Sequence, residues 1–428
     1  MKIYHIFFKK SVGFITLLIL LYNSPIFGIQ LTNLVYLFSG IYFVIFKKSF
    51  NREQKILILF GVFLVAYGAS YTLIREAGDF NMFNFSRLFT SLFSSVLICD
   101  CLKDNTNDQY GMVKWIGITA IFQAFIVLLA FFIPEFKTFL LELCGGSERY
   151  VNKLASMSVY RGIGWTYAQF SDFAVPEGMS VLCFICYCLS IRFRNKRMVS
   201  ITSNILFLIA IAAGLLIGRT FQIIIIIGVC YFSYCFIVSS HINVLLKEIN
   251  RFFIISSIII VGLGVKYWDE IPQQTRDWAF EMFTNLSDSK KIETSSTDEL
   301  QTMWVFPDKT IDLLFGIGLF QNPNPAGHPT FSGSDVGIVN SIFYWGILGS
   351  ILYYGSIILS FRYCARSGSS ILLKALSYSL LAVVLIYNIK GLCNGFAYAC
   401  LIMQWNINYK INAKNEIRKT SRSLGTIL

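Results

Sequence analysis

The chain has 428 residues, of which 55% are hydrophobic and 14% are charged, and its mean hydropathy is +0.61. Soluble globular chains carry about 25% charged residues, so this composition excludes an ordinary soluble protein and indicates that lipid is part of the solvent. The formal net charge of +12 would suit a nucleic-acid-binding protein. However, the basic residues stand in short clusters between apolar runs rather than in one stripe, and we therefore predict no nucleic acid partner.

The apolar runs predict an all-α polytopic membrane protein with about 12 transmembrane helices, because a helix needs ~20 apolar residues to cross a bilayer. The first six predicted spans are 11–27, 30–46, 55–74, 84–102, 112–133 and 174–191. The other six are 200–217, 219–239, 252–268, 337–361, 371–388 and 392–409.

The basic residues predict the orientation of these spans. With the N-terminus in the cytoplasm, most of the 36 Lys and Arg residues fall on the cytoplasmic side, as the positive-inside rule requires. Asn388, Lys390 and Asn394 interrupt the last pair of spans, and one long helix there would leave eleven. Eleven spans would place the basic C-terminal tail on the far side. The sequence therefore favours twelve spans with both termini cytoplasmic.

Two connections are much longer than the others and predict the working surface. They cover residues 134–173 and 269–336, and both lie on the non-cytoplasmic side of a single integral membrane domain spanning 1–428. Loops of this length are usually functional or disordered. Glu135–Leu143 and Gln273–Leu286 have helical apolar spacing, so we expect short helices within both loops.

Three arginines on the non-cytoplasmic side are candidates for binding phosphate. Arg161 ends the first long loop, Arg219 lies in a very short connection between two spans, and Arg87 begins the fourth span. A guanidinium group is a permanent cation whose planar fork of donors suits phosphate oxygens. The alternative is interfacial anchoring, which accounts for most arginines at membrane edges.

The end of the second long loop carries candidates for a general base. Asp335 stands at the mouth of the tenth predicted span, and His328 lies in a proline-rich stretch before it. A carboxylate or an imidazole can accept a proton from a sugar hydroxyl. Asp335 also suits the N-cap of the following helix. No group of His, Cys, Asp and Glu has metal-ligand spacing, so we predict neither a metal nor a cofactor.

Charged residues near the middle of a predicted span would indicate an ion or proton path. The charged residues inside the predicted spans, Asp100, Lys114 and Glu177, stand near span ends. This distribution disfavours a proton-coupled transporter.

Several of these stretches together resemble a known family. They are Arg161 to Gly164, Gly218 to Thr220, Leu314 to Gly318, Ser334 to Gly337 and Phe343 to Gly349. The pattern is similar to that of the Wzy-type O-antigen polymerases and, more distantly, to the O-antigen ligases of the same superfamily. The topology resembles the family over nearly the whole chain, whereas the local motifs cover a small part of it. The surroundings of His328 differ from those of the histidine on which the ligases depend.

The resemblance implies a metal-independent glycosyltransferase of lipopolysaccharide biosynthesis in the bacterial inner membrane. Such enzymes transfer a growing glycan from undecaprenyl diphosphate to a new lipid-linked repeat unit at the periplasmic face, and a chain-length regulator protein is an expected partner. On this reading Arg161 and Arg219 hold the donor diphosphate, Arg87 assists, and Asp335 or His328 deprotonates the acceptor. The alternatives are an O-antigen ligase, which uses lipid A-core as acceptor, and a lipid-linked oligosaccharide flippase or other transporter.

Overall fold

The computed structural model describes most of the chain and is almost entirely helical. The described residues are 2–27, 29–46, 48–75, 83–103, 108–145, 148–158, 161–167, 170–195, 201–238, 273–277, 281, 300–317 and 336–425. Within them, the strands β1 (Pro25–Ile26) and β2 (Ile29–Gln30) form one small antiparallel pair.

The helices follow one another with short connections. The first six are α1 (Lys2–Tyr22), α2 (Thr32–Ile45), α3 (Arg52–Arg75), α4 (Phe83–Leu102), α5 (Gly111–Phe132) and α6 (Pro134–Cys144). The next four are α7 (Glu148–Met157), α8 (Ser171–Asn195), α9 (Ile201–Ile217) and α10 (Arg219–Val238). The last are α14 (Thr310–Phe315), α15 (Gly337–Ser367), α16 (Ile371–Tyr387) and α17 (Phe396–Gly425).

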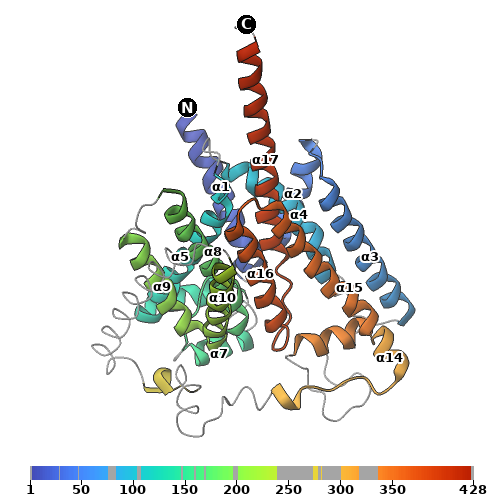
Figure 1. The fold of residues 1–428 in the computed structure, drawn as a ribbon. Helices are drawn as coiled ribbons and strands as arrows, with labels where there is room; N and C mark the ends of the chain where they lie inside the picture. The colour runs from blue at the N-terminus through green and yellow to red at the C-terminus, as the bar shows by residue number, and fades with distance from the viewer. Residues whose placement is uncertain are drawn as a thin grey trace.

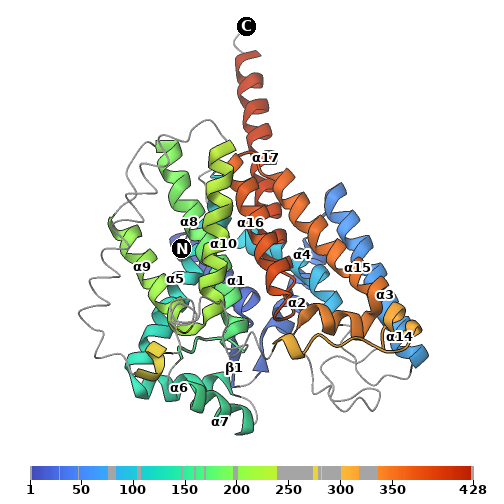
Figure 2. The same ribbon diagram turned by 60° about the horizontal axis from the view of Figure 1, so that its bottom comes forward.

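The long helices run roughly side by side, and both chain termini lie at one end of the bundle (Figure 1). We call this the terminal end and the opposite one the distal end. Figure 2 brings the distal end forward and shows α6, α7 and β1 on one side of it and α14 on the other. The short helices α6 and α7 fall within residues 134–173, and α14 falls within 269–336, so both long connections contain helix as predicted.

Four helical stretches among the described residues are long and apolar enough to cross a membrane, namely Arg52–Ser70, Gly111–Phe132, Asp172–Ile191 and Gly337–Ser367. Apolar side chains face outward on α3, where Leu59 is 69% exposed. Such exposure is costly in water and ordinary in lipid. The apolar helices therefore agree with a multi-pass membrane protein.

Eleven of the twelve predicted apolar segments coincide with a helix in the structure, and the segment 252–268 lies outside the described residues. The largest difference is at the C-terminus. The predicted segment ends at residue 409, but α17 continues to Gly425 and projects from the terminal end of the bundle (Figure 1). The residues 410–425 are polar, and helix formation there is independent of any apolar run.

The core forms where the helices cross. The helix α5 packs against α8 and α9, and α17 packs against α4 and α15. Close approach depends on small residues: a Cβ on Gly117 of α5 would lie 2.8 Å from the Cα of Phe184 in α8. The side chains of Leu17, Phe173 and Phe361 are fully buried in the resulting core.

Two glycines join α14 to α15 at the distal end. The helix α15 is interrupted at Gly346, which has a φ of 68°. Gly316, with a φ of 83°, ends α14 and packs on this interruption, where an added Cβ would lie 2.5 Å from the amide nitrogen of Gly346. The Tyr67 hydroxyl of α3 donates to the carbonyl of Trp345 at 3.0 Å. Two motifs of the family resemblance therefore meet backbone to backbone.

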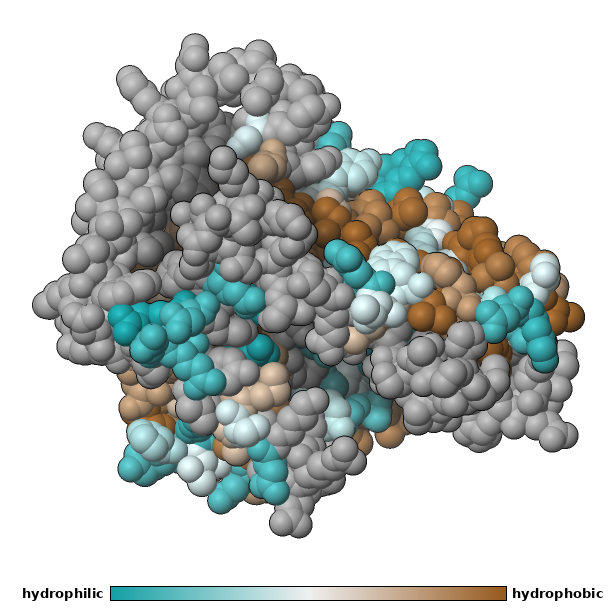
Figure 3. Space-filling view, turned by 90° about the horizontal axis from the view of Figure 1, so that it is seen from below, coloured by the Kyte–Doolittle hydropathy of each residue, from teal (hydrophilic) through white to brown (hydrophobic). Residues whose placement is uncertain are grey.

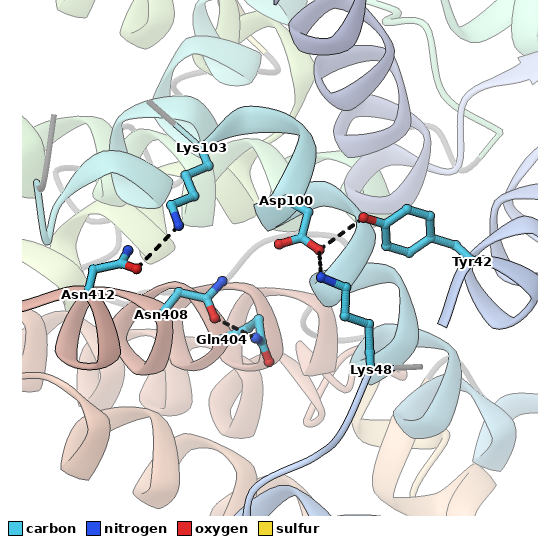
Figure 4. A network of polar contacts seen from close by, with 7 residues as sticks. All are labelled: Tyr42, Lys48, Asp100, Lys103, Gln404, Asn408 and Asn412. Carbon is cyan, nitrogen blue, oxygen red and sulfur yellow. Dashed lines mark hydrogen bonds and ion pairs between the residues drawn. The ribbon is translucent and has the colours of Figure 1, made fainter. Parts of the chain in front are cut away.

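A polar network fixes the helices at the terminal end (Figure 4). The Asp100 carboxylate of α4 accepts a hydrogen bond from the Tyr42 hydroxyl at 3.0 Å and pairs with the Lys48 ammonium at 2.7 Å. Lys103 donates to the side-chain oxygen of Asn412 on α17 at 3.3 Å. Each interaction joins a different element to α4, and we assign the network a structural role.

Candidate functional site

The segment that carries Arg161 is a fixed, non-helical stretch at the distal end, residues 161–167. The Gly162 amide donates to the carbonyl of Leu216 in α9 at 2.8 Å. The side chain of Gln123 in α5 accepts from the Trp165 amide at 3.1 Å and donates to the Trp165 carbonyl at 3.0 Å. These bonds satisfy backbone groups that have no helical partner, so the segment is ordered without being helical.

The same segment is tied to the first helical hairpin. The Thr166 hydroxyl donates to the carbonyl of Tyr22 at 2.5 Å, and the Trp165 indole donates to the carbonyl of Pro25 at 2.8 Å. Gly164 has no room for a side chain, since a Cβ there would lie 2.4 Å from the ring of Phe173. The glycines of the Arg-Gly-Ile-Gly sequence are therefore required for close packing against α5 and α8.

Arg161 and Arg219 lie on either side of the turn between α9 and α10. The guanidinium carbon of Arg161 is 5.2 Å from the centroid of the Phe170 ring, a cation–π distance. A Cβ on Gly218 would lie 3.8 Å from the carbonyl oxygen of the same Phe170. Arg219, the next residue, begins α10 and pairs with the carboxylate of Glu281. The fold therefore brings two of the three predicted arginines into one neighbourhood.

The third predicted arginine, Arg87, lies across α8 from this pair. Its side chain is exposed near the start of α4. Burial raises the pKa of the nearby Cys393 thiol to about 11, the Asp172 carboxylate raises it further, and the Arg87 guanidinium opposes this effect. Both charges are therefore close to Cys393, which lies in the connection between α16 and α17. This thiol is protonated at neutral pH and is no nucleophile there.

Asp172 is a carboxylate that the sequence did not single out. It is exposed in the first turn of α8, and its Oδ1 accepts a hydrogen bond from the Tyr387 hydroxyl at 2.5 Å. Tyr387 ends α16 and is itself buried. Asp172 follows closely on Phe170, the residue whose ring carries Arg161. The start of α8 therefore lies between Arg87 and the Arg161–Arg219 pair.

Asp335 and His328, the two predicted base candidates, lie outside the described residues. The residues that follow Asp335 are described and pack against the connection between α16 and α17. The Ile338 amide donates to the carbonyl of Asn388 at 3.0 Å, and a Cβ on Gly337 would lie 2.4 Å from the carbonyl oxygen of Gly391. This connection is thus shared by Tyr387, Cys393 and the start of α15.

The helices α6 and α7 form a cap next to residues 161–167. Their apolar faces enclose Leu140, Leu154 and Ile163. The Lys137 ammonium donates to the carbonyl of Ser158 at 2.7 Å, and partial burial lowers its pKa. Burial also raises the pKa of the Cys144 thiol to about 11, so this cysteine acts as a small apolar side chain. Figure 3 looks onto the distal end and shows hydrophobic residues over a broad area on the side of α14 and α15.

A buried carboxyl group supports the site from within the bundle. Glu177 of α8 is 0% exposed and accepts a hydrogen bond from the Tyr22 hydroxyl at 3.0 Å. Ser180 and the Tyr398 hydroxyl lie 2.8 Å apart beside it. Because Tyr22 also accepts from Thr166, the group connects α8 with the segment that carries Arg161. Its position near a span end was predicted, whereas its complete burial was not.

We expect Tyr22→Phe to lower the free energy of unfolding by about 1–3 kcal/mol, because the change removes the hydrogen-bond donor of a buried carboxyl group. Thermal denaturation of the detergent-purified protein measures the effect. Tyr378→Phe is the matched control, since Tyr378 is 39% exposed on α16. Equal melting temperatures for the two variants would contradict the support role of Tyr22.

Two of these groups gave weak signals in the sequence. Asp172 opens an apolar span, where an acidic residue normally reports only a helix start. Glu177 follows Pro176 within the first turns of the same span. Their significance depends on contacts with Tyr387 and Tyr22, which are remote in the chain and have no local pattern.

Comparison with known proteins does not place the chain in a family: no protein-family model matches it, and a search of curated proteins gives no match.

Proposed function

We propose that the protein is an O-antigen polymerase of the Wzy type, which joins undecaprenyl-diphosphate-linked repeat units at the periplasmic face of the inner membrane. It crosses the membrane about 12 times with both termini in the cytoplasm, so that the distal end of the bundle faces the periplasm. The observation that carries this proposal is the convergence of Arg161 and Arg219 on the turn between α9 and α10.

The chemistry needs permanent cations at that place. A diphosphate leaving group gains negative charge as the glycosidic bond breaks, and fixed arginines stabilise that charge without a metal. Arg161 is held over the Phe170 ring by a segment with bonded backbone groups, and Arg219 is fixed at the start of α10. Arg87 stands on the other side of α8, where it assists in binding donor or acceptor phosphate.

The acceptor requires a group that removes the proton of the attacking hydroxyl. Asp335 and His328 are the bases proposed from the sequence. The described residues after Asp335 lie against the connection between α16 and α17, near Arg87. A base placed there would meet an acceptor sugar on the side of α8 opposite the donor arginines. The lipid tails of both substrates extend into the bilayer beside the bundle.

The phenotype of a deletion strain tests this function. Loss of a polymerase leaves single repeat units on the lipopolysaccharide core, whereas loss of a ligase leaves none. We expect single units on silver-stained gels, and full-length polysaccharide on complementation with the wild-type gene. A core without any repeat unit would indicate the ligase instead, and lipid-linked units retained on the cytoplasmic side would indicate a flippase.

The pair between Arg219 and Glu281 predicts competition with the substrate. The carboxylate of Glu281 occupies an arginine that we assign to the donor diphosphate. We expect Glu281→Gln to lower the KM for the lipid-linked donor by about three- to tenfold at unchanged kcat, because a partly exposed ion pair contributes up to about 1 kcal/mol. Polymerisation rates at varied donor concentration measure this. A raised KM would show that Glu281 helps to orient Arg219 rather than to block it.

A further inference from the structure

Asp172 lies where the two halves of the distal site meet. Through Phe170 it adjoins the Arg161–Arg219 pair, and through Cys393 it shares a neighbourhood with Arg87. It is exposed, unlike Glu177, so a substrate at the distal end can reach it. A carboxylate among arginines stays ionised and remains a proton acceptor.

The surroundings of Asp172 hold it in one place. Tyr387 donates to its Oδ1 at 2.5 Å and is buried at the end of α16. The tyrosine is confined by backbone, since a Cβ on Gly391 would lie 2.7 Å from its hydroxyl oxygen. The next residue in α8, Phe173, is fully buried in the core. A carboxylate fixed by a buried donor and a buried neighbour is preorganised, as a catalytic group requires.

From this geometry we propose that Asp172 is a further catalytic residue, the carboxylate that accepts the proton of the attacking sugar hydroxyl. This inference rests on the proposed polymerase function. As the acceptor oxygen bonds to the anomeric carbon of the donor glycan, its proton passes to Asp172. The bond between that carbon and the phosphate oxygen breaks, and its electron pair leaves with undecaprenyl diphosphate, which the arginines hold. The proton is then released to water.

A structural role alone would also explain an acidic residue at this position. An acidic side chain in the first turn of a helix stabilises the helix dipole by about 0.3–1 kcal/mol. The two roles differ in what Asp172→Asn does. Asparagine keeps an oxygen that can accept from Tyr387, so the fold is retained, but it cannot take up a proton.

The test uses the full-length protein in lipid nanodiscs with a synthetic undecaprenyl-diphosphate-linked oligosaccharide. For Asp172→Asn we expect kcat to fall by about 100-fold or more, with the donor KM within about threefold of wild type. Asp172→Glu should recover part of the rate. Added formate should partly restore Asp172→Ala, because a small carboxylate fits the space left by the side chain. Asp308→Asn, at another exposed aspartate of the distal end, is the matched control and should keep the wild-type rate.

The outcomes separate this inference from the function on which it rests. An active wild type with an equally active Asp172→Asn variant overturns the role of Asp172 and leaves the polymerase proposal intact. A wild type that forms no polymer overturns both. Loss of activity in Asp172→Asn without formate rescue of Asp172→Ala, together with a lowered melting temperature of both, shows a structural role and also overturns the proposal.

Discussion

Arg161→Ala and Arg219→Ala are each expected to reduce the rate of polymerisation by about 10²–10³-fold, because removal of one preorganised donor from a developing anion has an effect of this size. Arg161→Lys and Arg219→Lys should recover only part of it, since an ammonium group lacks the planar fork that binds phosphate in a bidentate manner. Rates are measured as undecaprenyl diphosphate released per minute by purified protein.

Arg362→Ala is the control for this pair, since Arg362 is exposed in the part of α15 that follows the kink. It should have the wild-type rate. The melting temperature of each variant shows whether the protein is folded. Wild-type rates for folded Arg161→Ala and Arg219→Ala variants would refute the assignment of both residues to the donor diphosphate.

Gly346→Ala is expected to destabilise the distal end by about 3 kcal/mol or more. Two costs add: an L-residue in the left-handed region loses about 1–2 kcal/mol, and overpacking of a close contact costs about 1–3 kcal/mol. Gly346 has a φ of 68°, and its added Cβ would lie 2.2 Å from the carbonyl oxygen of Leu314. The obstacle is backbone and cannot rotate away, so α14 has to separate from α15. Thermal denaturation and limited proteolysis near residue 316 measure the change.

Gly355 provides a control within the same helix. A Cβ added there meets no atom within 4 Å. Gly355→Ala should therefore stabilise the helix by about 0.5–1 kcal/mol. If Gly346→Ala and Gly355→Ala had the same melting temperature, the contact between Gly316 and Gly346 would not hold α14 in place.

The helical segments were predictable because they follow from local composition. A run of apolar residues becomes a helix when lipid surrounds it, and that rule located α3, α5 and α15 without any knowledge of their neighbours. The same rule stopped α17 too early, because its polar C-terminal part forms helix beyond the apolar run. The sequence also marked Arg161 and Arg219 as cations on one side of the membrane, but it gave no distance between them.

The contacts that build the site depend on residues far apart in the chain. Asp172 gains its place from Tyr387, and Glu177 gains its burial from Tyr22. No spacing rule relates such pairs, because helix packing rather than chain order brings them together. The interpretation of Gly316 as a turn residue was sound locally, but its packing on Gly346 required the two backbones to be placed.

Reconstitution of the purified protein with a lipid-linked repeat unit tests the central claim most directly. We predict a ladder of glycans on undecaprenyl diphosphate, with one undecaprenyl diphosphate released for each new bond, and we predict that Arg161→Ala and Arg219→Ala abolish both products. A wild-type protein that leaves every lipid-linked unit unextended would contradict the account.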